Sequence, residues 1–460
     1  MLRNSMLSIA VALFGATAVL AQPETPPAPA APRNFTIPQV TRFDLPNGLK
    51  VRLVPWGTVP KVAVYLVTQT GRVDEGPNET WLSDLTAEML QQGTTSRTAE
   101  GIARQAAGMG GDLQVTTGLN QTQIGADVLA ESGPALVDLI ADVVRNPRLP
   151  ASELVRLKGD LSRQLSIERS RPQSIANEKF LATLFPSSSY GRLFPTAPMI
   201  DAYTADQVRA FNERNFGAAR SAIYVTGRFD LAAMEAAIRR NFAGWKAGAA
   251  ATTPAVSPVS RRSTVLIDRP GAVQSTLYIG LPTIDPTSPD YLPLVVTNAL
   301  LGGSFGSRIT SNIREQKGYT YSPFSTLATR LGAGSWAEIA DVTTNVTGPS
   351  IKEILGEIDK LRADPPTADE LRGIQNYLAG VFVLRNASRT GIINQLAFLD
   401  LYGLGEDYLR NYVQRVYAVT PADVQRLTQR YIDPSKLAII VAGDKKLVLE
   451  QLKPYGDVVE

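Results

Sequence analysis

One segment of the sequence matches a nucleophile motif, but the chain lacks the partner that the motif requires. Residues 302–306 read GGSFG and fit G-x-S-x-G, the turn that presents a catalytic serine in many hydrolases. Such a serine needs a histidine to accept its proton, and the 460-residue chain contains none. It also contains no cysteine, which excludes a thiolate nucleophile. We therefore interpret residues 302–306 as a glycine-rich turn.

The same composition restricts metal chemistry and the choice of partner. Zinc sites are built mainly from histidine and cysteine, so this chain alone cannot form a zinc site of the ordinary kind. The 46 basic and 43 acidic residues give a net charge of +3, and no basic run occurs. This balance argues against nucleic acid as a partner.

The N-terminus has the composition of a secretory signal peptide. Arg3 precedes an apolar stretch at residues 8–20, and the small residue Ala21 suits cleavage before Gln22. An uncleaved anchor is the alternative. Residues 22–34 are rich in proline and alanine and predict a tether. No later segment is apolar enough to span a membrane, so the mature chain is expected to be periplasmic or secreted and free of the membrane.

The remaining sequence repeats itself, which indicates two related domains. The segment that starts at Thr204 matches the one that starts at Thr420, and a segment from Leu149 matches one from Pro366. In each copy a threonine N-cap precedes an amphipathic helix, a short strand ends in Gly227 or Gly443, and a further helix follows. A repeat this long indicates duplicated domains rather than a solenoid.

Strands are also expected at the beginning of each half. In the first half, the turn Asn47-Gly48 predicts a hairpin that leads into residues 49–54. In the second half, we expect residues 264–267 and 274–279 to play the same part. The uncharged segment 247–260 reads as a linker. The sequence therefore predicts a signal peptide (1–21), a tether (22–34) and two homologous α+β domains (35–246 and 261–460), each with an antiparallel or mixed sheet packed with helices.

Several segments together resemble the pitrilysin/insulinase-type zinc peptidases, which include the mitochondrial processing peptidases. The similar features are the NGLKV hairpin at 47–51, Gln92-Gly93-Thr94, Gly110-Gly111 before a strand, and the segment from Ser304 discussed below. The duplicated halves also agree with this family, whose members build one half of a clamshell from two such domains. The resemblance covers nearly the whole mature chain.

The resemblance identifies the positions where active relatives bind zinc. Their first helix carries H-x-x-E-H, in which two histidines bind the metal and the glutamate is the general base. Here Asp84 and Glu88 stand at the histidine positions and Ala87 at the base position. Family spacing places the third ligand on Gln164. All four positions are changed, so the resemblance implies no metal on this chain.

Oxygen ligands at these positions could in principle serve calcium or magnesium. Three ligands, of which Gln164 is neutral, provide a weak site without a base. We therefore favour the interpretation that Asp84 and Glu88 belong to a solvated acidic helix face.

A second family motif is intact in the C-terminal half. The segment from Ser304 contains R-E-x-x-G-x-x-Y, with Arg314 and Tyr321 seven residues apart and Gly318 ending the helix between them. In the family, this arginine and tyrosine face the zinc site and bind the substrate backbone. The alternative is a surface arginine in an ion pair and a tyrosine at a domain edge.

The resemblance implies the non-catalytic subunit of a two-chain zinc peptidase. A homologous partner with H-x-x-E-H is expected to hold the zinc, while Arg314 and Tyr321 contact the peptide substrate in trans. The strand at 112–117 is a candidate edge for peptide addition. Two alternatives are an inactive homologue that binds peptides or acts as a scaffold in the cell envelope, and an independent hydrolase that uses only carboxylates.

Overall fold

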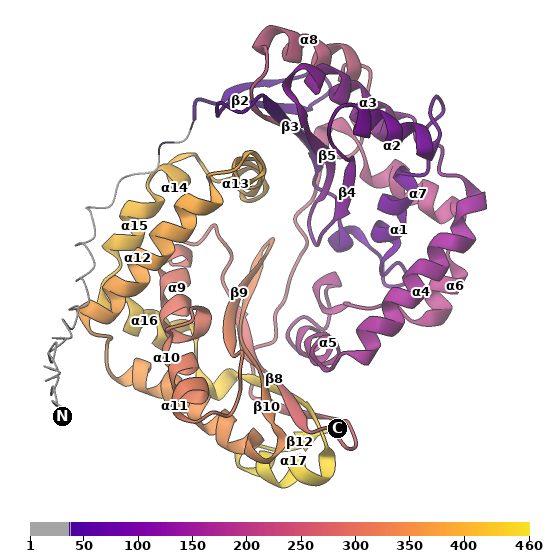
Figure 1. Cartoon of the computed structure of the whole chain (residues 1–460). Coiled ribbons are helices and arrows are strands. Elements are labelled where there is room, and N and C mark those ends of the chain that lie inside the picture. Colours follow the sequence, from indigo (N-terminus) through magenta and orange to yellow (C-terminus); the bar gives the residue numbers. More distant parts are fainter. Residues whose placement is uncertain (1–35, 37) are drawn as a thin grey trace, which may run out of the picture. The chain divides into compact units, whose positions relative to one another are not determined.

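The computed structural model describes residues 36 and 38–460, which form two six-stranded sheets packed with helices (Figure 1). This confirms the predicted α+β fold class. The predicted signal peptide (1–21) and tether (22–34) lie outside the described residues. Within the described part of the chain, no helix is both long and apolar enough to cross a membrane.

The first sheet has the strand order β1-β2-β6-β3-β5-β4. The strands are β1 (Thr41–Asp44), β2 (Lys50–Pro55), β3 (Lys61–Thr68), β4 (Gln114–Thr117), β5 (Thr122–Leu129) and β6 (Ser221–Gly227). β1 and β2 form the hairpin predicted from Asn47-Gly48, and Gly48 has a φ of 90° that suits glycine. β2 and β6 are parallel, and the other neighbours are antiparallel.

The second sheet repeats this plan in the order β12-β7-β11-β8-β10-β9. The strands are β7 (Ser263–Asp268), β8 (Gln274–Thr283), β9 (Phe324–Arg330), β10 (Ala333–Thr343), β11 (Ala438–Gly443) and β12 (Val458–Val459). The strands expected at residues 264–267 and 274–279 are present, but they do not pair as a hairpin like the first one. They form β7 and β8, which are separated by β11 and correspond to β2 and β3. The C-terminal β12 takes the place of β1.

Helices cover both sheets in corresponding order. In the first half they are α1 (Leu82–Leu90), α2 (Ala99–Gly108), α3 (Gly133–Arg145), α4 (Leu154–Ser170), α5 (Pro172–Leu184), α6 (Ala197–Ala202), α7 (Ala205–Asn215) and α8 (Leu231–Phe242). In the second half they are α9 (Tyr291–Asn298), α10 (Arg308–Thr310), α11 (Thr347–Ala363), α12 (Ala368–Arg385), α13 (Arg389–Tyr402), α14 (Asp407–Arg410), α15 (Tyr412–Ala418), α16 (Pro421–Tyr431) and α17 (Lys445–Leu452).

The predicted threonine caps explain why equivalent helices begin at equivalent positions. Thr204 accepts a hydrogen bond from the backbone N–H of Gln207, whose side chain accepts from the backbone N–H of Thr204. Thr420 and Asp423 form the same reciprocal pair at the start of α16. Such capping boxes satisfy backbone donors that the first helical turn leaves free.

Each half places one helix on the sheet of the other half (Figure 1). α5 packs on the second sheet, where the rings of Phe180 and Tyr278 have centroids 5.7 Å apart. α13, its equivalent in the duplication, packs on the first sheet through apolar side chains such as Leu396. Residues 247–262 connect the halves without helix or strand. The two halves are therefore joined by an exchange of equivalent helices as well as by this connection.

Candidate functional site

Helix α1 carries three of the residues predicted at the zinc-motif positions. One of them, Asp84, is bound by Arg72. Leu85 and Met89 are buried in the first core, which leaves Asp84 and Glu88 together on the more open face. The carboxylate of Asp84 accepts two hydrogen bonds from the guanidinium of Arg72, at 2.7 and 2.9 Å. Ala87 is buried and offers no polar group.

The third proposed ligand position lies on a neighbouring helix. Gln164 is exposed on α4, which packs against α1. From α4, Arg156 and Asp160 also act on Glu88. Glu88 is exposed, but partial loss of water around its carboxyl raises the pKa of that group. The nearby charge of Asp160 raises this pKa further, and Arg156 lowers it.

A buried carboxyl beside α1 was not anticipated from the sequence. Glu75 is buried and accepts hydrogen bonds from the backbone N–H and the hydroxyl of Ser83, at 2.9 and 2.5 Å. Burial raises the pKa of Glu75 to about 8, although the bonds from Ser83 oppose that shift. An acidic residue a few positions before a helix is the only sequence signal, and many exposed residues share it.

The structure brings Arg314 and Tyr321 together on the second half. Arg314 lies in a π-helical turn, η7 (Ser311–Gln316), with its guanidinium carbon 5.0 Å from the centroid of the Tyr321 ring. Phe305 contacts the same guanidinium at 4.3 Å from its ring centroid. Both rings are mostly exposed, at 80% for Tyr321 and 73% for Phe305. The guanidinium thus contacts two aromatic rings, one of which is the accessible phenol of Tyr321, and it also pairs with Glu315 at 3.2 Å.

Hydrogen bonds fix the segment that carries this pair. The side-chain amide of Asn312 donates to the carboxylates of Glu353 and Glu357 at 3.0 and 2.7 Å. These bonds attach η7 to α11. Gly318 has a φ of 64° and ends the turn as expected. Beyond it, the hydroxyl of Thr320 donates to the backbone oxygen of Asp341 on β10 at 2.7 Å. Arg314 and Tyr321 thus project from an anchored segment.

The glycine-rich stretch at 302–306 is a turn, buried at Gly302 and exposed at Phe305, which agrees with the interpretation made from the sequence. Its first two glycines end a second π-helical turn, η6 (Ala299–Gly303), and the hydroxyl of Ser304 is buried. Any side chain at Gly302 would collide with the carboxyl of Glu338 on β10. Glu338 is fully buried, no described residue hydrogen-bonds its carboxyl, and burial raises its pKa well above the usual value.

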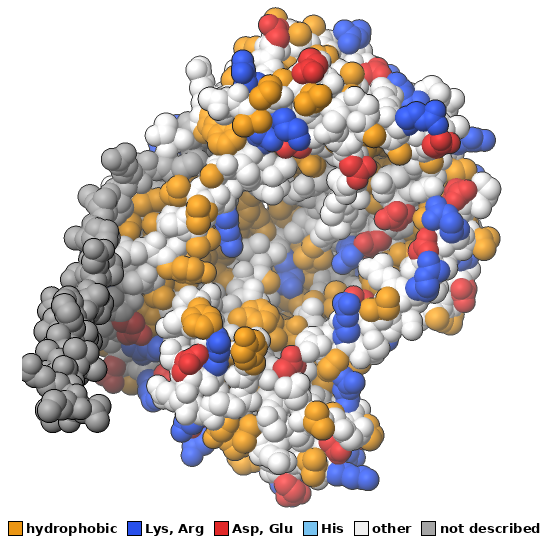
Figure 2. Space-filling view, viewed as in Figure 1, with side chains coloured by type: hydrophobic (Ala, Val, Ile, Leu, Met, Phe, Trp, Pro, Cys, Tyr) orange, Lys and Arg blue, Asp and Glu red, His pale blue; other side chains and the backbone are white. Residues whose placement is uncertain are grey.

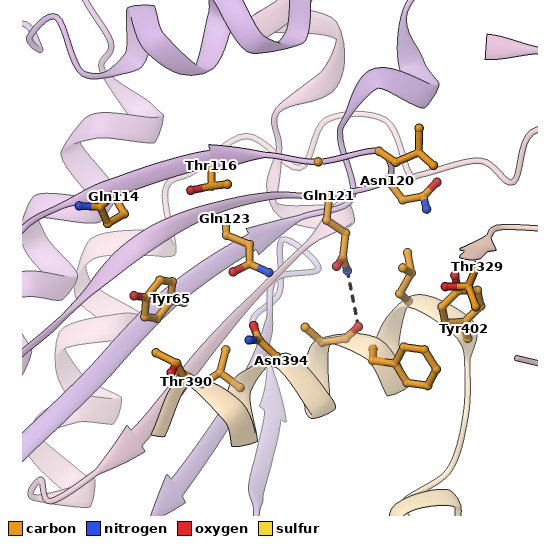
Figure 3. A pocket seen from close by; sticks show the side chains of 16 residues that line it. Tyr65, Gln114, Thr116, Asn120, Gln121, Gln123, Thr329, Thr390, Asn394 and Tyr402 are labelled. Carbon is orange, nitrogen blue, oxygen red and sulfur yellow. Dashed lines mark hydrogen bonds between the residues drawn. The ribbon is translucent and has the colours of Figure 1, made fainter. Parts of the chain in front are cut away.

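The strand predicted as an edge is the outer strand of its sheet and borders a cavity. β4 pairs only with β5, so one side of its backbone is unpaired. A cavity of about 660 Å³ lies between this end of the first sheet and α13 (Figure 3). The space-filling view shows a hollow in the face between the two halves (Figure 2).

Two family models match the chain, one mainly in each half. Residues 56–194 match the family described as Insulinase (Peptidase family M16), and residues 202–378 match the Peptidase M16 inactive domain. The chain belongs to the insulinase family, peptidase family M16. The first match contains the positions predicted to replace the zinc motif, and the second contains Arg314 and Tyr321.

Several M16 relatives are similar over most of their length. An uncharacterized zinc protease of Mycobacterium leprae is 25% identical over 90% of this chain and 94% of its own. One of Streptomyces coelicolor is 23% identical over 85% and 86%. Among solved structures, a peptidase M16 inactive domain from Pseudomonas fluorescens has a TM-score of 0.82 at 23% identity, covering 88% of this chain and 98% of its own. A protease from Helicobacter pylori has a TM-score of 0.83 at 16% identity, covering 89% and 100%.

The residues at the M16 zinc positions do not fit zinc. Asp84 is engaged by Arg72, Ala87 supplies neither base nor ligand, and Gln164 is a neutral amide. The described residues contain no group of three or more histidine, cysteine, aspartate or glutamate side chains placed to hold a metal ion. The chain is an M16 homologue that contains no histidine, so H-x-x-E-H does not occur in it.

Proposed function

We propose that this chain is the non-catalytic subunit of a two-chain periplasmic metallopeptidase. Its partner is a homologous subunit that carries H-x-x-E-H and holds the zinc. This chain completes the chamber around a peptide substrate and contributes Arg314 and Tyr321 to it in trans.

One observation supports this proposal above the others. The altered α1 positions cannot serve a metal, whereas Arg314 and Tyr321 remain together, accessible and anchored. An exposed Tyr321 contributes little to the core of this chain. Its exposure is better explained by a ligand or a partner that covers it.

The chemistry of the pair suits a peptide carbonyl that gains negative charge. A guanidinium presents several N–H donors in a fixed fork, and a phenol adds one O–H donor. The rings of Phe305 and Tyr321 limit the directions in which Arg314 can point. Donors placed in advance at a developing oxyanion contribute about 3–4 kcal/mol each in a water-excluded site.

The unpaired side of β4 provides a second contact for the substrate. An extended peptide can add to a sheet edge through backbone hydrogen bonds, whatever its side chains are. We assign this role to Gln114–Thr117, the outer strand of the first sheet.

Reconstitution with a homologue that carries H-x-x-E-H tests the proposal. We expect peptidase activity only when both chains are present, and a large loss in Arg314→Ala or Tyr321→Phe. Tyr319→Phe is the matched control, because Tyr319 lies in the same segment and contacts the second sheet through its backbone. Full activity of the partner alone would rule out the shared site.

A peptide-binding or scaffold protein of the cell envelope is the second candidate. The cavity beside β4 favours it, because the residues that line this cavity all belong to this one chain. This candidate predicts peptide binding without a peptidase partner and no effect of Arg314→Ala on that binding.

The periplasmic location is part of the proposal and has its own test. Mass spectrometry of the mature protein should find an N-terminus at Gln22, and the protein should appear in the periplasmic fraction. A mature chain that still contains residues 1–21 would indicate the uncleaved anchor, and recovery of the protein in the cytoplasmic fraction would contradict this location.

A further inference from the structure

The cavity beside β4 is lined by uncharged side chains. Its walls come from β3, β4 and β5 of the first sheet, from α13, and from Thr329 of β9. None of the described residues that line it is Asp, Glu, Lys or Arg. Just outside the cavity, Arg389 is paired with Asp127 at 2.7 Å. A ligand in this cavity therefore meets amides, hydroxyls and aromatic rings.

Two of the lining amides have hydrogen-bonding groups to spare. Gln121 donates to the backbone oxygen of Ala397, and Asn120 accepts from Tyr190. Gln123 of β5 and Asn394 of α13, in contrast, have no side-chain hydrogen bond to any other residue in the described part of the chain. Figure 3 shows these two side chains pointing into the same space from opposite walls. Each can donate and accept, as a peptide group requires.

The cavity continues along α13 into a second one. Asn394 and Phe398 line both, and the second cavity has a volume of about 540 Å³. Its lining includes Gly303 and Ser325, which lie beside the turn before Arg314. Arg385 is the one charged residue among those that line the second cavity. We call the two cavities together the α13 groove.

The groove also runs past one edge of each sheet. β4 and β9 are each one of the two outer strands of their sheet, so each has backbone N–H and C=O groups on one side without a strand partner. Thr116 of β4 and Thr329 of β9 line the first cavity, and Ser325 of β9 lines the second. Sheet edges and unused amides recognise the backbone of an extended polypeptide.

We propose that the α13 groove binds an extended peptide whose side chains are uncharged. Side chains such as Gln, Asn, Ser, Thr and Tyr can exchange hydrogen bonds with Gln123 and Asn394 and pack against Phe398. In the first cavity, a Lys or Glu side chain would lose water without gaining an opposite charge, which is unfavourable. This inference rests on the proposed function and names peptides with uncharged side chains as its substrate class. The binding itself requires only this chain.

Fluorescence anisotropy with short labelled peptides tests the proposal on the isolated full chain. The probe carries Gln, Asn, Ser and Thr around a central Tyr, and two matched peptides replace its central positions with Lys or with Glu. We expect the neutral peptide to bind about tenfold tighter than either charged one. Equal affinities, or binding of none of the three, would overturn the proposal.

A charge introduced into the groove gives a sharper result. Asn394→Asp should strengthen binding of the Lys peptide and weaken that of the Glu peptide, and Asn394→Lys should do the reverse. A folding defect cannot produce opposite changes for two peptides. If neither variant alters the order of affinities, the peptides do not occupy the groove.

Gln207→Glu is the matched control. Gln207 is exposed on α7, and glutamate can keep its capping contact with Thr204. This variant adds the same charge away from the groove, so the order of affinities should remain that of the unmodified chain. The assay contains no zinc-bearing partner, so its failure would leave the shared peptidase site untouched, and failure of reconstitution would leave the groove untouched.

Discussion

The segment between β3 and β4 and the segment between β8 and β9 are equivalent in the duplication but carry different chemistry. Each connects the fourth strand position of its sheet to the outer strand. The first contains a regular helix, α1, in which Asp84 is held by Arg72. The second contains the π-helical turns η6 and η7 and presents Arg314 and Tyr321. One backbone plan thus supports two kinds of surface.

The difference indicates where function is encoded in this fold. Both segments rest near a buried carboxyl, Glu75 in the first half and Glu338 in the second. What differs is the set of side chains that reaches solvent. The framework common to the two halves positions these groups but does not choose them.

The largest expected effect is on peptidase activity, which should depend on Arg314 in the second segment and not on Asp84 in the first. In the reconstituted peptidase, Arg314→Ala should lower kcat/KM about 10²–10³-fold, because a charged donor to the substrate is lost. Arg314→Lys should recover little, since lysine lacks the planar fork. Asp84→Ala should leave kcat/KM within about threefold, because an ion pair on this chain is all that it removes. Similar losses from both positions would contradict the division of roles.

The buried carboxyls predict that stability falls as pH rises. Burial raises the pKa of Glu75 from 4.5 to about 8, and the pKa of Glu338 is raised as well. The folded state therefore keeps protons that the unfolded chain has released above pH 4.5. We expect Glu75 alone to decrease the free energy of unfolding by about 3 kcal/mol between pH 5 and 8, and Glu338 to act in the same direction.

Urea denaturation at several pH values measures this dependence. Glu75→Gln and Glu338→Gln should each flatten it, because an amide does not titrate in this range. Glu213→Gln, which changes an exposed residue of α7, should not. If the slope stays the same in both buried variants, the carboxyls do not retain their protons.

A smaller effect is expected from the ring that supports Arg314. Phe305→Ala removes one of two aromatic contacts of the guanidinium, each contributing about 0.5–2 kcal/mol. The peptidase should lose about threefold to tenfold in kcat/KM while the stability of the chain stays nearly constant. Phe324→Ala is the control, because Phe324 is also an exposed aromatic residue but lies on β9. An equal loss from Phe324→Ala would mean that the rings act through general apolar contact.

The smallest effect belongs to the ion pair on α1. Arg72 and Asp84 keep 28% and 19% of their side-chain surface exposed, so water screens their attraction. Arg72→Ala should lower the free energy of unfolding by about 1 kcal/mol or less, measured in urea. A loss several times larger would show that α1 depends on this pair for its position.

Local signals in the sequence were sufficient for much of the fold. The Asn47-Gly48 turn, the threonine caps at 204 and 420, and the helices after β6 and β11 all depend on neighbouring residues, and they are present. The duplication then made the α+β class predictable. Features that depend on distant residues were missed, namely the pairing of β12 with β7 and the exchange of α5 and α13.

The candidate site divides in the same way. Arg314 and Tyr321 could be proposed because the motif that contains them is intact in the sequence, although the direct contact between them and the added contact of Phe305 with Arg314 could not be anticipated. Glu75 and Glu338 were missed because a glutamate is ordinarily exposed, and burial depends on packing from distant elements. The π-helical turns were missed as well, since no residue pattern distinguishes them from ordinary helix.

The exchange of α5 and α13 affects how the chain folds during its synthesis. The first sheet is complete when residue 227 has been made, but the helix that covers one of its faces ends only at residue 402. At 5–20 residues per second, synthesis of the intervening residues takes roughly 10–35 s. During that time the apolar side chains of Val54, Ala63 and Tyr224 have no partner from α13. A newly made first half therefore needs protection from aggregation until the second half arrives.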